Sequence, residues 1–194
     1  IPGAAGTLTH DDIEKNLNFI AKAEIFLTQL ETPYKVTSYA LKKAKEKGLA
    51  TILNPAPACK IKDDDFELID FFTPNETEAE FYLNKKIETE KDIKSASEEF
   101  LKKGIKNIVI TLGEKGCYFA NKKENFFIEA FKLKSPVLDT TGAGDAFNGA
   151  LAVGLSKDLD IKEALIFANQ VAAISTTKQG AAASMPSLED IKNY

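Results

Sequence analysis

The amino-acid sequence predicts an α/β fold, a three-layer sandwich in which helices cover both faces of a mostly parallel sheet. Short apolar runs typical of buried strands alternate along the chain with longer stretches of helical periodicity, and this alternation is typical of parallel sheets. The chain has 194 residues, of which 44% are hydrophobic. That is enough for one substantial core, so we expect a single domain over residues 1–194.

The first half of the chain contains three expected strands, over residues 23–30, 49–55 and 68–74. A helix is expected to start after Thr9, where THDD places a capping-box acid at Asp12. A lysine-rich helix over residues 33–47 separates the first two strands. It has a proline at its start and Gly48 just past its end, the positions that these residues prefer.

In the second half, NETEAEFYL (75–83) opens a helix with acids in its first turn, and a further helix is expected over residues 89–103. Residues 107–113 form the clearest strand, because Ile, Val and Thr dominate it. Residues 116–120 and 125–131 resemble a hairpin. Helices over 144–156 and 160–177 follow, and then a polar tail.

Short motifs lie at the ends of several expected strands: QLE (29–31), NPAPA (54–58), TPNE (73–76), TLGEKG (111–116) and DTTGAGD (139–145). In parallel sheets, ligands bind beyond the carboxyl ends of the strands. We therefore expect one functional edge.

The overall composition excludes several classes of function. The net charge is −4 and the lysines are spread out, so we expect no nucleic-acid or membrane partner. The chain has no run of 18 apolar residues and no signal peptide, which predicts a cytoplasmic protein. Two distant cysteines and a single histidine, His10, argue against a zinc site or a histidine-dependent triad.

The stretch DTTGAGDAFNGAL (139–151) places Gly142 and Gly144 directly before Asp145. Asp145 can be an acid that interacts favourably with a helix dipole. Alternatively, it accepts a proton from a substrate hydroxyl while the glycine backbone binds a phosphoryl group. A dinucleotide fingerprint does not fit, because Phe147 stands where a third glycine is needed, and the chain has no P-loop motif.

These motifs carry a resemblance to a known family. DTTGAGDAFNGALA (139–152) is similar to the second signature of the ribokinase-like (PfkB) sugar kinases. NPAPA, TPNETEAE (73–80), ITLGEKG (110–116) and KQGAAASMP (178–186) resemble the ribokinase branch, in the same order. The resemblance implies ATP-dependent phosphorylation of D-ribose at its 5-hydroxyl, with ATP, Mg²⁺ and K⁺ as cofactors.

The resemblance implies that Asp145 is the catalytic base and also a sugar contact, with the N–H groups of Gly142, Ala143 and Gly144 as the anion hole. It implies a second sugar contact from Glu31, and a contact of Glu78 with Mg²⁺ through water. The implied nucleotide-binding residues are Asn75, Thr111, Gly113, Gly116, Gly144 and Asn169.

Several of these residues also have a plain structural interpretation. Asn75 and Glu78 can simply cap a helix, Thr111 can be a strand residue, and Asn169 can be a polar helix position. The resemblance further implies a monovalent-cation site, mostly of backbone carbonyls, at Asp139, Thr141, Ser175, Lys178, Gly180 and Ser184. Hard oxygen ligands suit such an ion.

The chain begins with Ile1-Pro2-Gly3, and the resemblance implies that the N-terminal third of the family is missing. That third supplies strands of the sheet, a lid and most of the sugar pocket, so we expect an unpaired sheet edge, with a homodimer possible only in the full-length form. Two alternatives remain open: another PfkB sugar or nucleoside kinase, for fructose or deoxyribose, or a nucleotide-binding fragment without catalysis.

Overall fold

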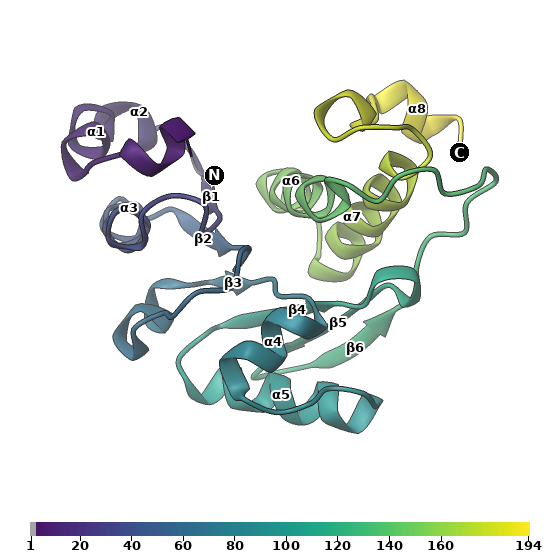
Figure 1. The fold of residues 1–194 in the computed structure, drawn as a ribbon, viewed down its shortest axis with the longest axis horizontal. Helices are drawn as coiled ribbons and strands as arrows, with labels where there is room; N and C mark the ends of the chain where they lie inside the picture. Colours follow the sequence, from purple (N-terminus) through teal and green to yellow (C-terminus); the bar gives the residue numbers. More distant parts are fainter. Residues whose placement is uncertain (1–2) are drawn as a thin grey trace. The chain divides into compact units, whose positions relative to one another are not determined.

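The computed structural model describes residues 3–194 (Figure 1), and the chain divides into two compact units. The first unit extends to Leu112 and includes Tyr118–Phe126; the second comprises Gly113–Cys117 and Phe127–Tyr194. The expectation of a single domain stays a prediction. None of the helices in the described range is long and apolar enough to cross a membrane.

A six-stranded sheet has the strand order β1-β2-β3-β4-β5-β6. Its strands are β1 (Ile25–Thr28), β2 (Ala50–Leu53), β3 (Phe71–Phe72), β4 (Asn107–Thr111), β5 (Cys117–Asn121) and β6 (Asn125–Ile128). The first four strands are parallel. Near the carboxyl ends of β1, β2 and β3, Thr28 pairs with Leu53, and Leu53 pairs with Phe72. The α/β class with a mostly parallel sheet is therefore confirmed.

The predicted hairpin is confirmed between β5 and β6. Three residues separate these neighbouring strands, and the Asn121 N–H donates to the Glu124 carbonyl at 3.0 Å. A connection this short joins antiparallel strands.

The helices of the first unit are η1 (Gly3–Thr7), α1 (His10–Lys15), α2 (Leu17–Ile20), α3 (Tyr34–Glu46), η2 (Asp63–Leu68), α4 (Glu76–Leu83) and α5 (Glu90–Lys102). The capping box predicted at Thr9 and Asp12 starts α1, and Thr89 with Asp92 starts α5 in the same way. Helix α3 packs on β1 and β2, while α4 and α5 pack on β4.

The second unit contains η3 (Gly113–Lys115), α6 (Ala143–Ser156), α7 (Ile161–Ser175), η4 (Ala182–Ser184) and α8 (Leu188–Lys192). Helices α6 and α7 pack closely, because a Cβ built at Gly154 would lie 2.9 Å from the Ala164 Cβ. The expected polar tail thus includes a short helix, α8, which Ser187 and Asp190 cap.

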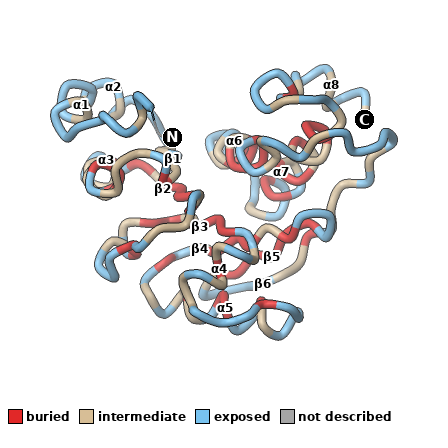
Figure 2. The backbone as a smooth tube through the Cα atoms, in the orientation of Figure 1, coloured by how far each residue is buried: buried red, intermediate tan, exposed pale blue. Residues whose placement is uncertain are grey.

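The predicted strand over residues 68–74 is longer than the strand observed. Only Phe71–Phe72 form β3, because η2 extends to Leu68. Hydrogen bonds to β2 continue on both sides, from Asp70 N to Thr51 O at 3.2 Å and from Thr73 N to Leu53 O at 3.0 Å. Figure 2 shows buried residues along the central strands and, within the second unit, along α6 and α7.

Candidate functional site

The turn that leads into α6 contains a glycine in a left-handed conformation. Gly142, the residue before the helix, has a φ of 79°, a left-handed conformation that favours glycine. A Cβ at Gly142 would also lie 3.3 Å from both the Ala181 Cα and the Met185 Cε. Glycine is therefore favoured here by its conformation, and a Cβ would fit only tightly.

The first turn of α6 presents a backbone donor next to a carboxylate. Gly144 and Asp145 are both exposed, and a Cβ at Gly144 would meet no atom within 4 Å. The N–H of Gly144 has no acceptor within the helix, because it belongs to the first turn. The Ala143 N–H donates to the Thr140 carbonyl at 3.2 Å, so it is partly engaged in holding the turn.

Asp139 connects this turn to the segment after α7. One carboxylate oxygen accepts the Thr141 N–H at 2.9 Å, and the other accepts the Gly180 N–H at 2.9 Å. Hydrogen bonds from the Thr141 hydroxyl and from these backbone N–H groups hold the pKa of Asp139 below its usual range. Three of the six residues predicted for the cation site, Asp139, Thr141 and Gly180, are thus in direct contact.

The other three predicted cation residues lie at the end of α7 and in the segment that follows it. Ser175 and Ser184 are buried, and their hydroxyls donate to backbone carbonyls at 2.8 and 2.7 Å. The Lys178 ammonium lies 3.3 Å from an Asp190 oxygen. Nowhere in residues 3–194 do three His, Cys, Asp or Glu side chains form a metal-binding group.

The loop before β5 and one position of α7 also belong to the second unit. Gly113 and Gly116 have φ values of 57° and 99°, and the Gly116 N–H donates to the Gly113 carbonyl at 3.0 Å. Asn169 is nearly buried in α7, and its Nδ2 donates to the Cys117 Sγ at 3.5 Å. Gly113, Gly116, Gly144 and Asn169, four of the predicted nucleotide residues, are therefore in one compact unit.

The remaining predicted residues lie in the first unit, at the carboxyl ends of its strands. Asn75 forms an isolated parallel bridge with Thr111, whose N–H donates to the Pro74 carbonyl at 2.9 Å. Glu31 is exposed shortly after β1. The predicted polar edge is thus present on this part of the sheet.

Asn75 and Glu78 form a capping box at the start of α4. The Glu78 N–H donates to the Asn75 side chain at 2.8 Å, and the Asn75 N–H donates to the Glu78 Oε2 at 2.9 Å. Burial raises the pKa of Glu78, and the Asn75 N–H only partly opposes this effect. Helix capping, the plain interpretation of these residues, is therefore a real role of both.

Gln29 and Asn54 are two polar residues at this edge of the sheet for which the sequence analysis predicted no role. Asn54 is buried beyond β2; its Oδ1 accepts from Gln29 at 3.1 Å, and its Nδ2 donates to the Thr73 carbonyl at 2.9 Å. This side chain connects the ends of β1, β2 and β3. The motifs QLE and NPAPA contain both residues, but only the three-dimensional arrangement brings them together.

The single histidine, His10, has a structural role. The His10 ring stacks on Tyr39 with 4.4 Å between ring centroids, and its Nε2 lies 3.1 Å from the Lys35 carbonyl oxygen. These contacts attach α1 to α3, although His10 is exposed in the first turn as expected.

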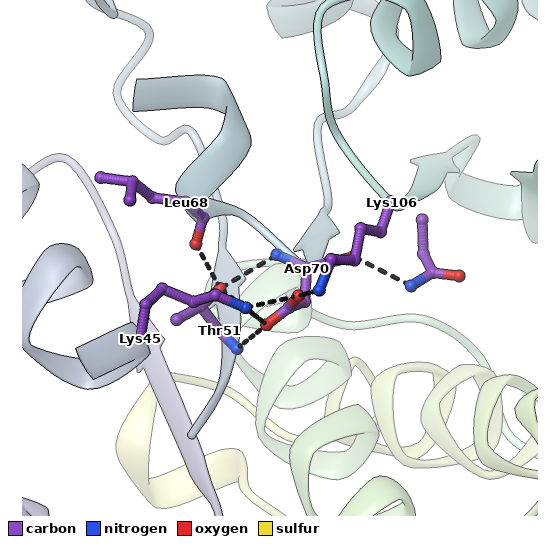
Figure 3. Close-up of polar contacts among 6 residues, drawn as sticks. Lys45, Thr51, Leu68, Asp70 and Lys106 are labelled. Atoms are coloured by element: carbon purple, nitrogen blue, oxygen red, sulfur yellow. Dashed lines mark hydrogen bonds and ion pairs between the residues drawn. The ribbon is translucent and has the colours of Figure 1, made fainter. Parts of the chain in front are cut away.

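At the opposite ends of the strands, Asp70 forms an ionic cluster (Figure 3). Its carboxylate lies 2.7 Å from both the Lys45 and the Lys106 ammonium groups, and it accepts the Thr51 N–H at 2.9 Å. Burial disfavours the charged form, but the two lysines and the Thr51 N–H outweigh burial and lower the pKa of Asp70. The cluster joins α3, β2 and the segments that precede β3 and β4.

Comparisons with known proteins agree with the sequence resemblance. Residues 2–188 match the model of the pfkB family carbohydrate kinases. The chain is 40% identical over 190 residues to a ribokinase of Staphylococcus aureus, covering 97% of this chain and 62% of that protein. It is 34% identical over 195 residues to a deoxyribokinase of Salmonella typhi, covering 100% of this chain and 63% of that protein.

A solved structure supports the same assignment. The structure of Arabidopsis thaliana ribokinase complexed with ribose and ATP matches with a TM-score of 0.91 and 28% identity, over 100% of this chain and 62% of that one. The chain thus spans about three fifths of the length of these relatives. From the family match, the sequence identity and the shared fold, we conclude that the chain belongs to the pfkB family of carbohydrate kinases.

Proposed function

We propose that this chain carries the nucleotide-binding residues and the catalytic base of an ATP-dependent kinase that phosphorylates the 5-hydroxyl of D-ribose. The observation that carries the proposal is the turn into α6, where left-handed Gly142 and exposed Gly144 directly precede exposed Asp145. This turn places backbone donors for an anion beside an acceptor for a proton. Phosphoryl transfer needs both.

In the proposed reaction, Asp145 takes the proton from the sugar hydroxyl. The hydroxyl oxygen forms a bond to the γ-phosphorus of ATP, and the bond from that phosphorus to the β,γ-bridging oxygen breaks, which releases ADP. The backbone N–H groups of Gly142, Ala143 and Gly144 stabilise the negative charge on the transferring group. The Ala143 N–H is the least available of these donors, because it already bonds to Thr140.

The nucleotide is proposed to contact Gly113, Gly116, Gly144 and Asn169, which belong to the second unit. Asn75 and Thr111 stay predicted nucleotide-binding residues of the first unit. The Staphylococcus aureus and Arabidopsis thaliana relatives, both called ribokinases, support ATP and ribose as substrates. Glu31 is proposed to contact the sugar.

The residues present fit a magnesium ion and a monovalent cation. Glu78 offers carboxylate oxygens, the kind of ligand that Mg²⁺ takes, and Mg²⁺ usually keeps several waters; the bond from Asn75 leaves lone pairs of Glu78 for such a water. When bound, Mg²⁺ would neutralise charge on the phosphate oxygens. Asp139 and the carbonyls of the 175–184 segment would hold K⁺.

The experiment that tests the base is Asp145→Asn in the complete gene product, with Glu163→Gln as the matched control. Both acids are exposed in the first turn of a helix, Asp145 in α6 and Glu163 in α7. We expect D145N to lower kcat by about 10²- to 10⁴-fold and to leave ATP binding nearly unchanged, while E163Q keeps wild-type turnover. Wild-type turnover by D145N would leave only the helix-dipole role.

A second candidate function is phosphorylation of a related sugar, because a deoxyribokinase is among the relatives at 34% identity. Initial rates with ribose, deoxyribose, fructose and a nucleoside separate the candidates. Ribose is expected to have the highest kcat/KM, and a higher value for another compound would reassign the substrate.

A further inference from the structure

Within residues 3–194, the only acceptor recorded for the Asn169 amide is a buried thiol. Cys117 opens β5 directly after Gly116 and has no exposed surface, and Asn169 of α7 is 8% exposed. The Asn169 Nδ2 lies 3.5 Å from the Cys117 Sγ. Both residues belong to the second unit, so this bond joins the glycine loop to α7.

The Cys117 thiol is an uncharged partner for this hydrogen bond. Burial raises the pKa of Cys117 to about 12, so the sulfur stays protonated and neutral at physiological pH. A neutral thiol is a weak acceptor and a weak donor, whereas the amide of Asn169 has two good donors on Nδ2. The bond therefore orients the amide without placing a charge beside it.

The bond also determines which atom of the amide is available to a ligand. Residues 3–194 contain no buried side-chain nitrogen or oxygen that lacks a hydrogen-bond partner. Nδ2 is engaged by sulfur, so Oδ1 is the amide atom that can face outward. An outward carbonyl oxygen is an acceptor, and it favours a ligand that presents an N–H donor.

We infer that Cys117 is a positioning residue that holds the Asn169 amide with Oδ1 outward and thereby favours a 6-aminopurine nucleotide over a 6-oxopurine nucleotide. The inference rests on the function proposed above, in which Asn169 contacts the nucleotide, and it adds that this contact is made to the 6-position of the base. The 6-amino group of adenine donates to Oδ1, whereas the 6-oxo group of hypoxanthine is an acceptor and repels it. If the amide were reversed, Nδ2 would face the base and the preference would be lost or inverted.

The test compares ATP with ITP, which carries a 6-oxo group in place of the 6-amino group. The dissociation constants of both nucleotides are measured by calorimetry on the purified protein, for the wild type and three variants. Cys117→Val fills the same space without an acceptor. Cys117→Ser keeps an acceptor, and Cys117→Ala is a second variant without one, for use if valine prevents folding.

We expect the wild type to bind ATP more tightly than ITP. C117V and C117A should lower that ratio about threefold to tenfold, the range expected for one lost hydrogen bond, while C117S stays close to wild type. A role in packing alone predicts the reverse order, with C117V close to wild type and C117S destabilised. That result, or an unchanged ratio in C117V and C117A, overturns the inference.

Asn169→Ala provides a further control. It should lose the same discrimination, and adding C117V to it should change the ratio no further, because the two residues act through one hydrogen bond. Additive losses in the double variant would overturn the inference. Equal binding of ATP and ITP by the wild type overturns it but leaves the kinase proposal intact, whereas failure of the wild type to bind ATP overturns both.

Discussion

The Asp139 carboxylate accepts the Gly180 backbone N–H at 2.9 Å, a contact between residues 41 positions apart in the chain. Asp139 lies just before the turn into α6, and Gly180 lies after the end of α7. The Thr176 carbonyl strengthens the same connection by accepting the N–H groups of Leu138 and Asp139 at 2.8 and 3.2 Å. The segment that follows α7 therefore holds the glycine turn that precedes Asp145.

Replacing Asp139 by asparagine should impair catalysis more than folding. Both carboxylate oxygens of Asp139 accept backbone N–H groups, and an amide nitrogen cannot accept, so one of these bonds is lost. We expect kcat in potassium to fall about tenfold, the equivalent of one charge-assisted hydrogen bond, and potassium stimulation to decrease.

The measurement for Asp139 is the initial rate over a potassium titration at constant ionic strength. Glu189→Gln, an exposed change on α8, serves as the control and should keep the wild-type potassium response. Full potassium stimulation in D139N would exclude Asp139 from the cation site.

Gly116→Ala should destabilise the protein strongly. Gly116 has a φ of 99°, and a Cβ there would overlap the Ile128 carbonyl oxygen and lie 2.6 Å from the Ala130 nitrogen. Because both neighbours are backbone atoms that cannot simply rotate away, we expect a loss of about 2–4 kcal/mol in the free energy of unfolding. Gly113→Ala is the control, with a φ of 57° and no atom near its Cβ, and should cost about 1 kcal/mol. Equal losses in urea denaturation would contradict the steric argument.

Gly154→Ala and Gly149→Ala, both within α6, should change stability in opposite directions. A Cβ at Gly154 would lie 2.9 Å from the Ala164 Cβ, whereas one at Gly149 would meet no atom within 4 Å. We expect G154A to lose about 1–3 kcal/mol by forcing α6 and α7 apart, and G149A to gain about 0.5–1 kcal/mol from helix propensity. Thermal unfolding of both variants checks this, and a stable G154A would mean that the two helices separate easily.

Asp70→Asn should lower stability near neutral pH, because it leaves Lys45 and Lys106 without their shared carboxylate. Both ammonium groups are partly exposed, so we expect about 1–3 kcal/mol rather than the larger loss of a fully buried pair. The folded-state pKa of Asp70 is lowered, so its contribution is present above the unfolded pKa of about 3.9 and is lost as pH falls through the folded value. The difference between wild type and D70N should therefore shrink in urea denaturation below about pH 4.

Asp63→Asn is the matched control for Asp70. The side chain of Asp63 is 91% exposed, and its oxygen lies 3.6 Å from the Lys103 ammonium group. An exposed pair of this kind contributes little, so D63N should match wild type at every pH. A loss in D63N as large as that in D70N would point to general charge effects instead of the cluster.

Much of the fold could be predicted because its signals are local. The predicted capping box at Thr9 starts a helix, and the helix predicted from Thr89 begins there. The apolar runs that contain β1, β2 and β4 form strands within the predicted ranges. The extent of β3 was wrong, because η2 continues to Leu68. A hydrophobic run alone does not distinguish a strand from the end of a short helix that precedes it.

In the candidate site, too, some features could be predicted from local sequence and others could not. The first-turn position of Asp145 follows from the local order of glycines and acid, and the sequence predicted it. The left-handed conformation of Gly142 was not predicted and is seen only in the structure. The hydrogen bond from Asn169 to Cys117 joins residues 52 positions apart, and the bond from Gln29 to Asn54 joins residues 25 positions apart. No local sequence pattern predicts either bond.

By itself, the sequence determined the α/β class, the order of the elements and the turn that precedes Asp145, because hydrophobic periodicity, helix caps and glycine conformation act over a few residues. Only the tertiary structure decided which distant groups meet: Asp139 with Gly180, Asp70 with two lysines, and Asn169 with Cys117. These contacts depend on strand register and helix packing, which place side chains to within an ångström. Local propensities do not specify positions that finely.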